Sequence, residues 1–342
     1  MLQFSVILPT YNRKQQLAKV IAGLELQTFD HAQFEVIVVS DGSQDGTDDY
    51  LRTLNPSFKL RSVFQPNQGV AATRNNGVSH ASGRLILFID DDVVPHPELL
   101  ARHYQSHQQA DFATSTIVIG PMLNPPDFNY QPWVEWEQQM LYKQYAAMDR
   151  GDWEATARQF YTGNCSIHLS YFKRFGGFDP SFRRAEDVEL AYRMAGQGAK
   201  FVWNNQAIGY HYAQRSYASW LDTPYAYGRN DVVFTRERGQ SWLVPTLMRE
   251  YPGRSLLIRT MNRMCLDRSW LSLPLQRLSF GLALMSDTLN LKPLYRASFS
   301  IIFNLRYFQG MSDELGGRNK FFTLLASHSK SSSSLTDSFN AT

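Results

Sequence analysis

The feature that constrains this chain most is a short apolar run, residues 85–89, that ends in three consecutive aspartates, Asp90, Asp91 and Asp92. Such a run predicts a buried strand. Adjacent carboxylates at its end repel one another unless a cation lies among them, and carboxylate oxygens are the ligands that hard divalent ions prefer. We therefore expect a divalent-metal site here, with an exposed acidic turn as the alternative. If strand alternation continues past residue 89, Asp90 and Asp92 face the same side.

A second acidic pair, Glu186 and Asp187, follows a glycine-rich stretch about a hundred residues later. A metal-holding cluster and a separate carboxylate are the two parts that a metal-assisted group transfer with a general base requires. The simpler interpretation is a helix N-terminus, where the helix dipole favours acidic residues. The hypothesis of a transferase therefore requires both acidic segments to line one cleft.

The composition is that of an ordinary globular protein, since 43% of its 342 residues are hydrophobic and 19% are charged. Its two cysteines, Cys165 and Cys265, are far apart and lack a metal-binding spacing, so we expect neither a disulfide framework nor a zinc site. The N-terminal residues are typical of a first strand rather than a secretion signal, and no apolar stretch reaches the roughly 18 residues of a spanning helix. We expect a cytoplasmic protein, or one bound peripherally at the inner face of the membrane.

The first half of the chain alternates strand-like and helix-like segments. Strands are predicted at residues 4–8, 34–40, 60–64 and 84–89, and helices at 14–26, 46–54, 69–81 and 97–108. This order predicts an α/β fold with a mainly parallel, doubly wound sheet, because each parallel pair needs a crossover connection. The polar residues that follow the strands then meet at the C-terminal edge of the sheet, where open α/β sheets bind ligands.

We divide the chain into a catalytic domain at 1–216, a helical C-terminal region at 217–320 and a flexible, serine-rich tail at 321–342. Within the first domain, residues 121–163 form an aromatic-rich insertion whose length suggests a lid or an acceptor-binding wall. The insertion contains Trp133, Trp136 and Trp153, which could stack on an acceptor, but we expect two of the three to pack in a core.

The helical region carries the positive charge of the chain. Residues 236–320 contain 13 lysines and arginines against 6 acidic residues, whereas 1–235 contain 20 against 24. Arg259 and Arg263 lie beside leucines and methionines in an amphipathic pattern that fits either an anionic membrane or packing within the protein. We favour internal packing and keep peripheral membrane contact through 255–310 as the alternative. Prolines 274 and 293 are predicted to lie in the first turns of successive helices.

Three further segments fall at the same predicted sheet edge. The first contains Thr10, Tyr11 and Arg13, the second begins at Asp41, and the third leads into a helix with Arg74. Each is also compatible with an ordinary turn, a helix cap or a solvated surface residue. At one edge, however, a carboxylate suits a base or ribose, and a guanidinium near a helix N-terminus suits a diphosphate.

Together these motifs form an ordered set. Pro-Thr-Tyr-Asn-Arg, Asp-Gly-Ser-x-Asp-Gly-Thr, Asn-x-Gly-x-Ala-x-x-Arg-Asn-x-Gly, Asp-Asp-Asp after a strand, and Gly-Gly-Phe-Asp-x-x-Phe before Glu-Asp-x-Glu-Leu-x-x-Arg occur in this order between about residues 3 and 215. The set resembles glycosyltransferase family 2, whose members are nucleotide-sugar enzymes with the GT-A fold. The C-terminal third carries no comparable motif.

The resemblance also implies roles for individual residues. Nucleotide-sugar contacts fall on Pro9, Thr10, Tyr11, Arg13, Asp41, Arg74, Asp90 and Asp91, with Asp41 reading a uracil edge and Arg74 on the diphosphate side. The Asp-x-Asp motif makes Asp92 the expected direct ligand of Mn²⁺ or Mg²⁺, with Asp90 as a further candidate. His211 resembles a third ligand or a diphosphate contact, which requires it to fold back onto the aspartates; otherwise it is a packed histidine. Asp187 matches the catalytic base, with Glu186 beside it.

The implied reaction is an inverting transfer of a hexose-type sugar from a nucleotide diphosphate sugar, expected to be a UDP-sugar. The acceptor is expected to be a hydroxyl of a saccharide or lipid-linked saccharide in cell-envelope or exopolysaccharide synthesis, and no nucleic acid is expected as a partner. Two alternatives stay open. One is a sugar-phosphate nucleotidyltransferase, although its glycine-rich first loop is lacking here, and the other is a catalytically silent sugar-binding scaffold.

Overall fold

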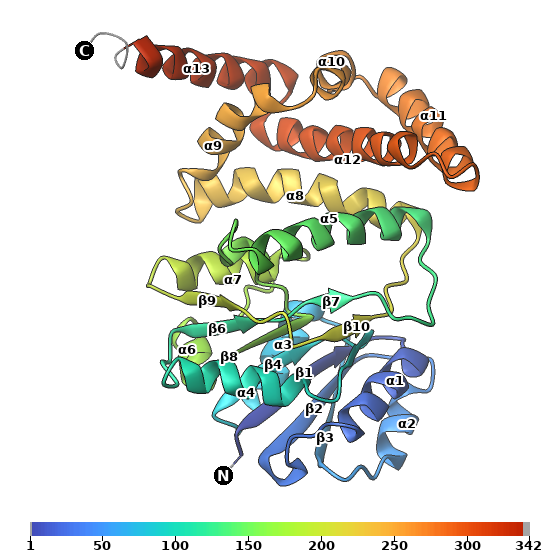
Figure 1. Ribbon diagram of the computed structural model, residues 1–342, viewed down its shortest axis with the longest axis vertical. Helices are drawn as coiled ribbons and strands as arrows, with labels where there is room; N and C mark the ends of the chain where they lie inside the picture. The colour runs from blue at the N-terminus through green and yellow to red at the C-terminus, as the bar shows by residue number, and fades with distance from the viewer. Residues whose placement is uncertain (1, 338–342) are drawn as a thin grey trace. The chain divides into compact units, whose positions relative to one another are not determined.

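The computed structural model describes residues 2–337, which form two compact units (Figure 1). Of the described residues, unit 1 comprises 2–129 and 138–213, and unit 2 comprises 130–137 and 214–337. A short part of the expected insertion thus belongs to the helical unit. In the described part of the chain, no helix is both long and apolar enough to cross a membrane.

Unit 1 is built on a seven-stranded sheet with the strand order β3-β2-β1-β4-β8-β6-β9. Its strands are β1 (Phe4–Thr10), β2 (Phe34–Asp41), β3 (Lys59–Gln65), β4 (Leu85–Ile89), β6 (Thr116–Ile119), β8 (Asn164–His168) and β9 (Lys200–Trp203). All neighbouring pairs are parallel except those of β8, which runs antiparallel to β4 and β6. The predicted α/β class with a mainly parallel sheet is therefore confirmed.

Helices cover both faces of this sheet because its central strands are apolar on both sides. In β1, Phe4, Val6 and Leu8 belong to a core shared with α1 (Lys14–Glu25) and α4 (Leu99–Gln109). The alternate residue Ile7 faces α3 (Val70–Ser79), where a Cβ on Gly77 would lie 2.8 Å from Ile7 Cγ2. Other helices of the unit are α2 (Thr47–Thr53), α5 (Pro132–Asp149, shared with unit 2), α6 (Leu169–Arg174), α7 (Glu186–Ala195) and the 3₁₀ turns His31–Gln33 and Ala157–Gln159.

A second, three-stranded sheet in unit 1 has the order β5-β10-β7. It is formed by β5 (Val93–Pro95), β7 (Met122–Leu123) and β10 (Gly209–His211). The antiparallel pairing of β10 with β5 places His211 opposite Val93, the residue that follows the three aspartates. This small sheet therefore places His211, near the C-terminal end of unit 1 in the sequence, beside the turn that follows β4.

Unit 2 consists mainly of helices, and α8 packs against α12 at very close range. A Cβ on Gly228 would lie 1.9 Å from the Tyr307 carbonyl oxygen, and one on Gly310 would lie 2.0 Å from that of Tyr225, so only glycine fits at both positions. The helices are α8 (Tyr217–Glu237), α9 (Leu243–Glu250), α10 (Leu256–Cys265), α11 (Ser269–Thr288), α12 (Lys292–Leu315) and α13 (Arg318–Asp337), with a 3₁₀ turn at Tyr251–Gly253.

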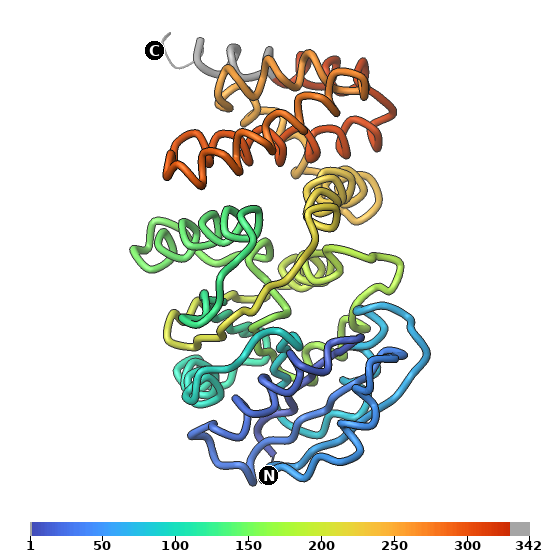
Figure 2. The backbone as a smooth tube through the Cα atoms, turned by 90° about the vertical axis from the view of Figure 1, so that its right-hand side faces the viewer, coloured from blue at the N-terminus to red at the C-terminus, as the bar shows by residue number. Residues whose placement is uncertain are grey.

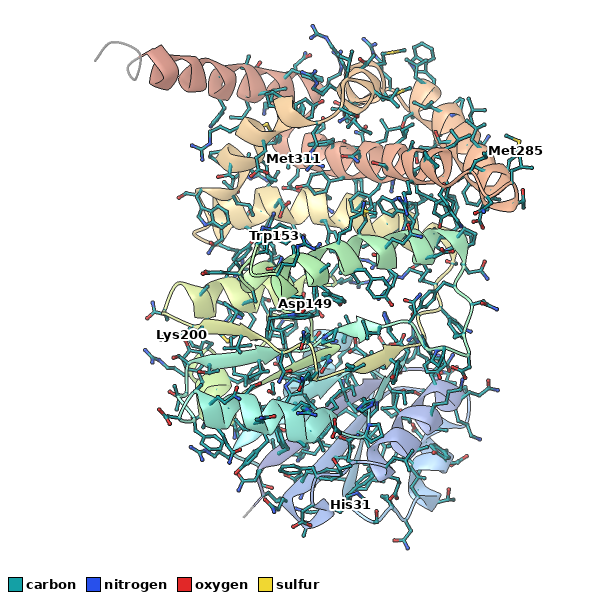
Figure 3. The ribbon with its side chains drawn as sticks, in the orientation of Figure 1. His31, Asp149, Trp153, Lys200, Met285 and Met311 are labelled. Carbon is teal, nitrogen blue, oxygen red and sulfur yellow. The ribbon has the colours of Figure 1, made fainter. Side chains whose placement is uncertain are left out.

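The predicted positions of two prolines, and the exposure of two tryptophans of the insertion, can be compared with the structure. Pro293 lies in the first turn of α12 as predicted, but the prediction for Pro274 is wrong, because α11 begins five residues earlier and contains it. Trp136 is buried beside Trp220, whereas Trp153 is 51% exposed (Figure 3).

The expected flexible tail differs from the structure over most of its length. Helix α13 continues through residue 337, and its Phe321 is fully buried against Tyr251 and Phe308. One buried aromatic ring supplies enough apolar contact to hold the start of this helix on unit 2. The last part of the predicted tail, residues 338–342, lies outside the described residues.

A buried carboxylate, Glu35, ties the N-terminal ends of the strands together. It accepts hydrogen bonds from Ser5 Oγ at 2.8 Å, Ser82 N at 2.9 Å and Lys59 Nζ at 2.8 Å. Burial alone would raise its pKa, but the hydrogen bonds from Lys59, Ser82 and Ser5 lower the pKa to about 2. The ionised form is therefore the one that the fold stabilises.

We predict that Glu35→Gln lowers the free energy of unfolding at neutral pH by roughly 2–3 kcal/mol, because hydrogen bonds to a charged group are lost. A lowered pKa stabilises the fold above the unfolded value of 4.5, and this contribution disappears as the pH falls towards about 2. Urea unfolding across this pH range should show the two proteins converging in acid. An equal gap at every pH, or a gap as small as that of Glu98→Gln, would contradict this account.

Candidate active site

The three aspartates lie in a turn, because β4 ends at Ile89. The Val93 amide donates to the Asp90 carbonyl at 3.1 Å and closes this turn. Arg13 Nη1 pairs with both Asp91, at 3.3 Å, and Asp92. Strand alternation therefore does not extend beyond residue 89, so the condition under which Asp90 and Asp92 were expected to share a side does not hold.

Asp91 and Asp92 are both only 7% exposed, and each has a neutralising partner. Thr10 Oγ1 donates to Asp91 at 2.7 Å, beside the contact from Arg13. Burial raises the pKa of Asp91 to about 7, while the charge of Arg13 opposes that rise. The Asp91 carboxylate is therefore costly to keep ionised, which is the electrostatic condition expected beside a cation site.

His211 lies near the C-terminal end of unit 1 in the sequence, yet it contacts the aspartate turn. Its Nε2 lies 3.5 Å from Asp92 Oδ1, and the Tyr212 amide donates to the Asp92 carbonyl at 2.7 Å. The chain therefore folds back as a ligand role for His211 requires. That role itself stays a prediction.

The residues present fit a divalent ion that is completed by a substrate. In the described part of the chain, no three His, Cys, Asp or Glu side chains form a ready-made metal site. Asp92 and His211, however, present a carboxylate oxygen and an imidazole nitrogen to the same place. Mg²⁺ and similar ions at phosphate-binding sites commonly use one or two protein ligands, with phosphate and water as the others.

A buried arginine joins the two acidic segments. Arg74, on α3, is 3% exposed; its Nη2 lies 2.7 Å from Asp90 Oδ1 and its Nη1 lies 2.7 Å from Glu186 Oε1. The carboxylates raise the pKa of Arg74 although burial opposes this, so the guanidinium remains charged. The segments around residues 90 and 186 therefore belong to one cluster within unit 1.

Asp187 lies beside this cluster in the first turn of α7. Its Oδ1 accepts a hydrogen bond from the Val188 amide at 2.8 Å, and the residue is partly exposed. Burial, together with the negative charge of Glu186, raises the pKa of Asp187. A carboxylate with a raised pKa that solvent can reach is suited to accept a proton near neutral pH.

The segment before α7 is fixed by contacts that the sequence analysis did not identify. Arg193 pairs with Glu189 at 2.8 Å and donates to the carbonyls of Phe175 and Gly177. Asn75, one residue after Arg74, exchanges two hydrogen bonds with the backbone of Phe178. The sequence does carry a signal for the Glu189–Arg193 pair, because oppositely charged residues at i, i+4 in a helix can form an ion pair.

Two neighbouring loops are also joined to each other. Asn12, in a left-handed conformation with φ of 54°, accepts from the Gln44 amide at 2.6 Å, and its own amide donates to Ser43 Oγ at 3.0 Å. The buried Asp41 side chain accepts from the amides of Gln68 and Gly69, both at 2.9 Å. These contacts link the ends of β1, β2 and β3.

The remaining predicted contacts differ in exposure. Pro9 is buried within β1, and Tyr11 is 49% exposed. The roles predicted for Pro9, Tyr11 and Asp41 towards a nucleotide stay predictions, as does the diphosphate role of Arg74.

Residues 5–172, which contain these loops and the aspartate turn, match the family model described as glycosyl transferase family 2. This part of the chain belongs to glycosyl transferase family 2. One curated relative of this chain is validoxylamine A glucosyltransferase of Streptomyces hygroscopicus subsp. limoneus, 30% identical over 230 residues, which are 60% of this chain and 50% of the relative. The chain spans about half the length of the curated relatives that it matches first.

Solved structures share the fold of this chain. Residues 1–349 of S. aureus TarS, in complex with UDP-GlcNAc, align with a TM-score of 0.55 and 19% identity over 92% of this chain and 93% of that one. The mannosyltransferase PcManGT from Pyrobaculum calidifontis, in complex with GDP-Man and Mn²⁺, aligns with a TM-score of 0.58 and 19% identity over 92% and 87%. The fold is that of the GT-A glycosyltransferases, as the sequence motifs predicted.

We predict that Arg74→Gln in the family 2 domain lowers the free energy of unfolding by about 3–5 kcal/mol, because the partners of a buried ion pair lose their counter-charge. Adding Glu186→Gln to this variant should restore part of the loss. Arg52→Gln is the matched control, since that arginine is 58% exposed in a surface pair. Calorimetric melting of the four proteins tests this, and equal losses from Arg74→Gln and Arg52→Gln would contradict it.

Proposed function

We propose that this chain is an inverting glycosyltransferase that moves a hexose-type sugar from a nucleotide diphosphate sugar to an acceptor hydroxyl. The observation that carries the proposal is the joining of Asp90 and Glu186 through Arg74. Through this bridge, the aspartate turn with His211 and the partly exposed Asp187 belong to one region of unit 1. These are the two parts that a metal-assisted transfer with a general base requires.

In the proposed reaction, Asp187 accepts the proton of the acceptor hydroxyl as its oxygen attacks the anomeric carbon. The bond from that carbon to the diphosphate oxygen breaks, and the nucleoside diphosphate leaves. A single displacement of this kind inverts the anomeric configuration and needs no covalent sugar intermediate. Arg74 holds Glu186 beside Asp187, and burial together with this neighbouring carboxylate raises the pKa of Asp187.

We propose that Asp92 and His211 hold Mn²⁺ or Mg²⁺, with Asp90 close by. When bound, such an ion neutralises the negative charge that develops on the leaving diphosphate. Arg13 lies against Asp91 and Asp92 with a side chain that is 38% exposed, so it can contribute positive charge at the same place. Both metal-site residues keep their position through the backbone bond from Tyr212 to Asp92.

The donor is proposed to be a UDP-sugar, with Asp41 next to the base. Support comes from fold neighbours that hold UDP-GlcNAc or GDP-Man, and from the ends of β1 and β2, which are tied at the sheet edge where nucleotides bind. We propose a saccharide or lipid-linked saccharide as the acceptor, in cell-envelope or exopolysaccharide synthesis. The glucosyltransferase relative and the structural neighbours support a sugar-transfer reaction rather than nucleotidyl transfer.

We predict that Asp187→Asn lowers the transfer rate by about 10²–10⁴, the usual contribution of general-base catalysis, while donor affinity is retained. Because the pKa of Asp187 is raised, the wild-type rate should rise with pH through the neutral range as its proton is lost. Donor binding measured by calorimetry and turnover of a UDP-sugar panel test both expectations. The control is Asp49→Asn, whose carboxylate is 85% exposed; normal turnover by Asp187→Asn would remove this residue from the mechanism.

We also predict that chelation of divalent metal abolishes donor hydrolysis and transfer, and that Mn²⁺ or Mg²⁺ restores both. In Asp92→Asn, half-maximal activity should require at least tenfold more metal, because one anionic ligand is lost. Asp152→Asn, 59% exposed, serves as the control. Titration of activity against metal concentration measures the effect, and full activity in excess chelator would argue against a metal at this site.

A further inference from the structure

Helix α11 exposes many of its large apolar side chains to solvent, although its Phe280 packs inward against Tyr217 and Trp133. Its exposed large residues are Trp270, Leu273, Leu278, Leu284 and Met285, with exposures of 71%, 52%, 62%, 37% and 48%. The buried residues of the same helix are Gln276, Ser279, Ala283 and Ser286. Leu271, Leu275, Phe280 and Leu282 are partly buried, so apolar residues lie on both sides of this helix, whereas a surface helix usually has a polar outer side. Its outer side is therefore suited to contact an apolar partner.

The exposed apolar surface continues on both sides of α11. We define the apolar face as the exposed leucines, methionines and tryptophan of α10, α11 and the start of α12: Leu256, Leu257, Met264, Trp270, Leu273, Leu278, Leu284, Met285, Leu289, Leu291 and Leu294. Helices α10 and α11 both pack on α12, and α11 and α12 again lie side by side in the rotated view of Figure 2. Met285 lies on the outer side of α11 (Figure 3).

The charges around the apolar face are almost all positive. Residues 254–297 contain seven lysines and arginines but only two acidic residues. Both acids are engaged, since Asp267 accepts from Gln309 Nε2 at 2.7 Å and Asp287 pairs with Lys292 at 3.4 Å. Arg263 and Arg277 are exposed beside the leucines.

The exposed apolar residues and the positive charges around them together distinguish between two candidate partners, a second copy of the chain and a lipid bilayer. A second copy of the chain, docked face to face, would bring two arginine-rich surfaces together, and like charges across an interface are strongly unfavourable. The surface of an anionic bilayer offers both an apolar layer and negative headgroups, and tryptophan is enriched at that depth. We found no helix in the described part of the chain that could cross a membrane, so such contact would be parallel to the surface.

We propose that the apolar face binds the surface of an anionic lipid bilayer. Its leucines and Trp270 enter the boundary between headgroups and acyl chains, and Arg263 and Arg277 lie at the phosphates. The proposal concerns unit 2 alone and does not depend on the reaction proposed for unit 1. A lipid-linked acceptor would, however, be presented at the same surface.

Vesicle flotation of the full chain tests the proposal. Wild type should float with vesicles of equal phosphatidylglycerol and phosphatidylcholine at low salt, and bind pure phosphatidylcholine much more weakly. Arg263→Gln with Arg277→Gln should weaken binding about 25-fold, because each lost charge lowers the affinity roughly fivefold. Trp270→Ser with Leu278→Ser should weaken it at least tenfold, because apolar area no longer enters the bilayer.

Matched controls come from unit 1. Leu26→Ser with Arg150→Gln removes one exposed apolar residue and one exposed charge, at 67% and 63% exposure, and should bind as wild type does. All variants change exposed residues, so circular dichroism melting should be unchanged. No flotation of wild type, or equal binding by every variant, would overturn the proposal. A concentration-dependent dimer that Trp270→Ser with Leu278→Ser disrupts, without vesicle binding, would assign the face to a second copy instead.

Discussion

The candidate site depends on one buried ionic contact, that of Arg74 with Asp90 and Glu186. Without a shared cation, the acids after β4 and those at the start of α7 would repel each other. A buried guanidinium can satisfy two carboxylates at once because its donors are arranged in a rigid fork. Arg74 thereby fixes the distance between the aspartate turn and Asp187, and it does so from α3, a helix packed on the central strands.

The rest of the site is arranged around that contact. Asn75, the next residue on α3, binds the backbone before α7, and Arg193 holds the carbonyls of the same segment. On the other side, Arg13 neutralises Asp91 and Asp92, and the pairing of β10 with β5 supplies His211. Each acidic residue thus has a cationic or hydrogen-bonding partner, which is what allows so many carboxylates to be close together in a folded chain.

The sequence predicted the sheet and the loops at its edge well, because apolar strands and glycine-containing turns are local signals. It could not predict how the carboxylates are paired. The alternation argument for Asp90 and Asp92 depended on a strand that ends at Ile89, and the end of a strand is set by its neighbours in the sheet. The approach of His211 to Asp92 depends on the pairing of two three-residue strands, which are too short to have a pattern of their own.

In unit 2 the sequence also could not predict how the side chains are arranged, but the reason was different. Amphipathic patterns indicated helices correctly, but periodicity alone does not say which side of a helix is buried. Only the structure shows that α11 leaves Trp270, Leu278 and Met285 exposed while Gln276 and Ser279 are buried. The basic excess at residues 236–320 then has a physical meaning, because positive charge next to exposed leucines opposes self-association and attracts an anionic surface.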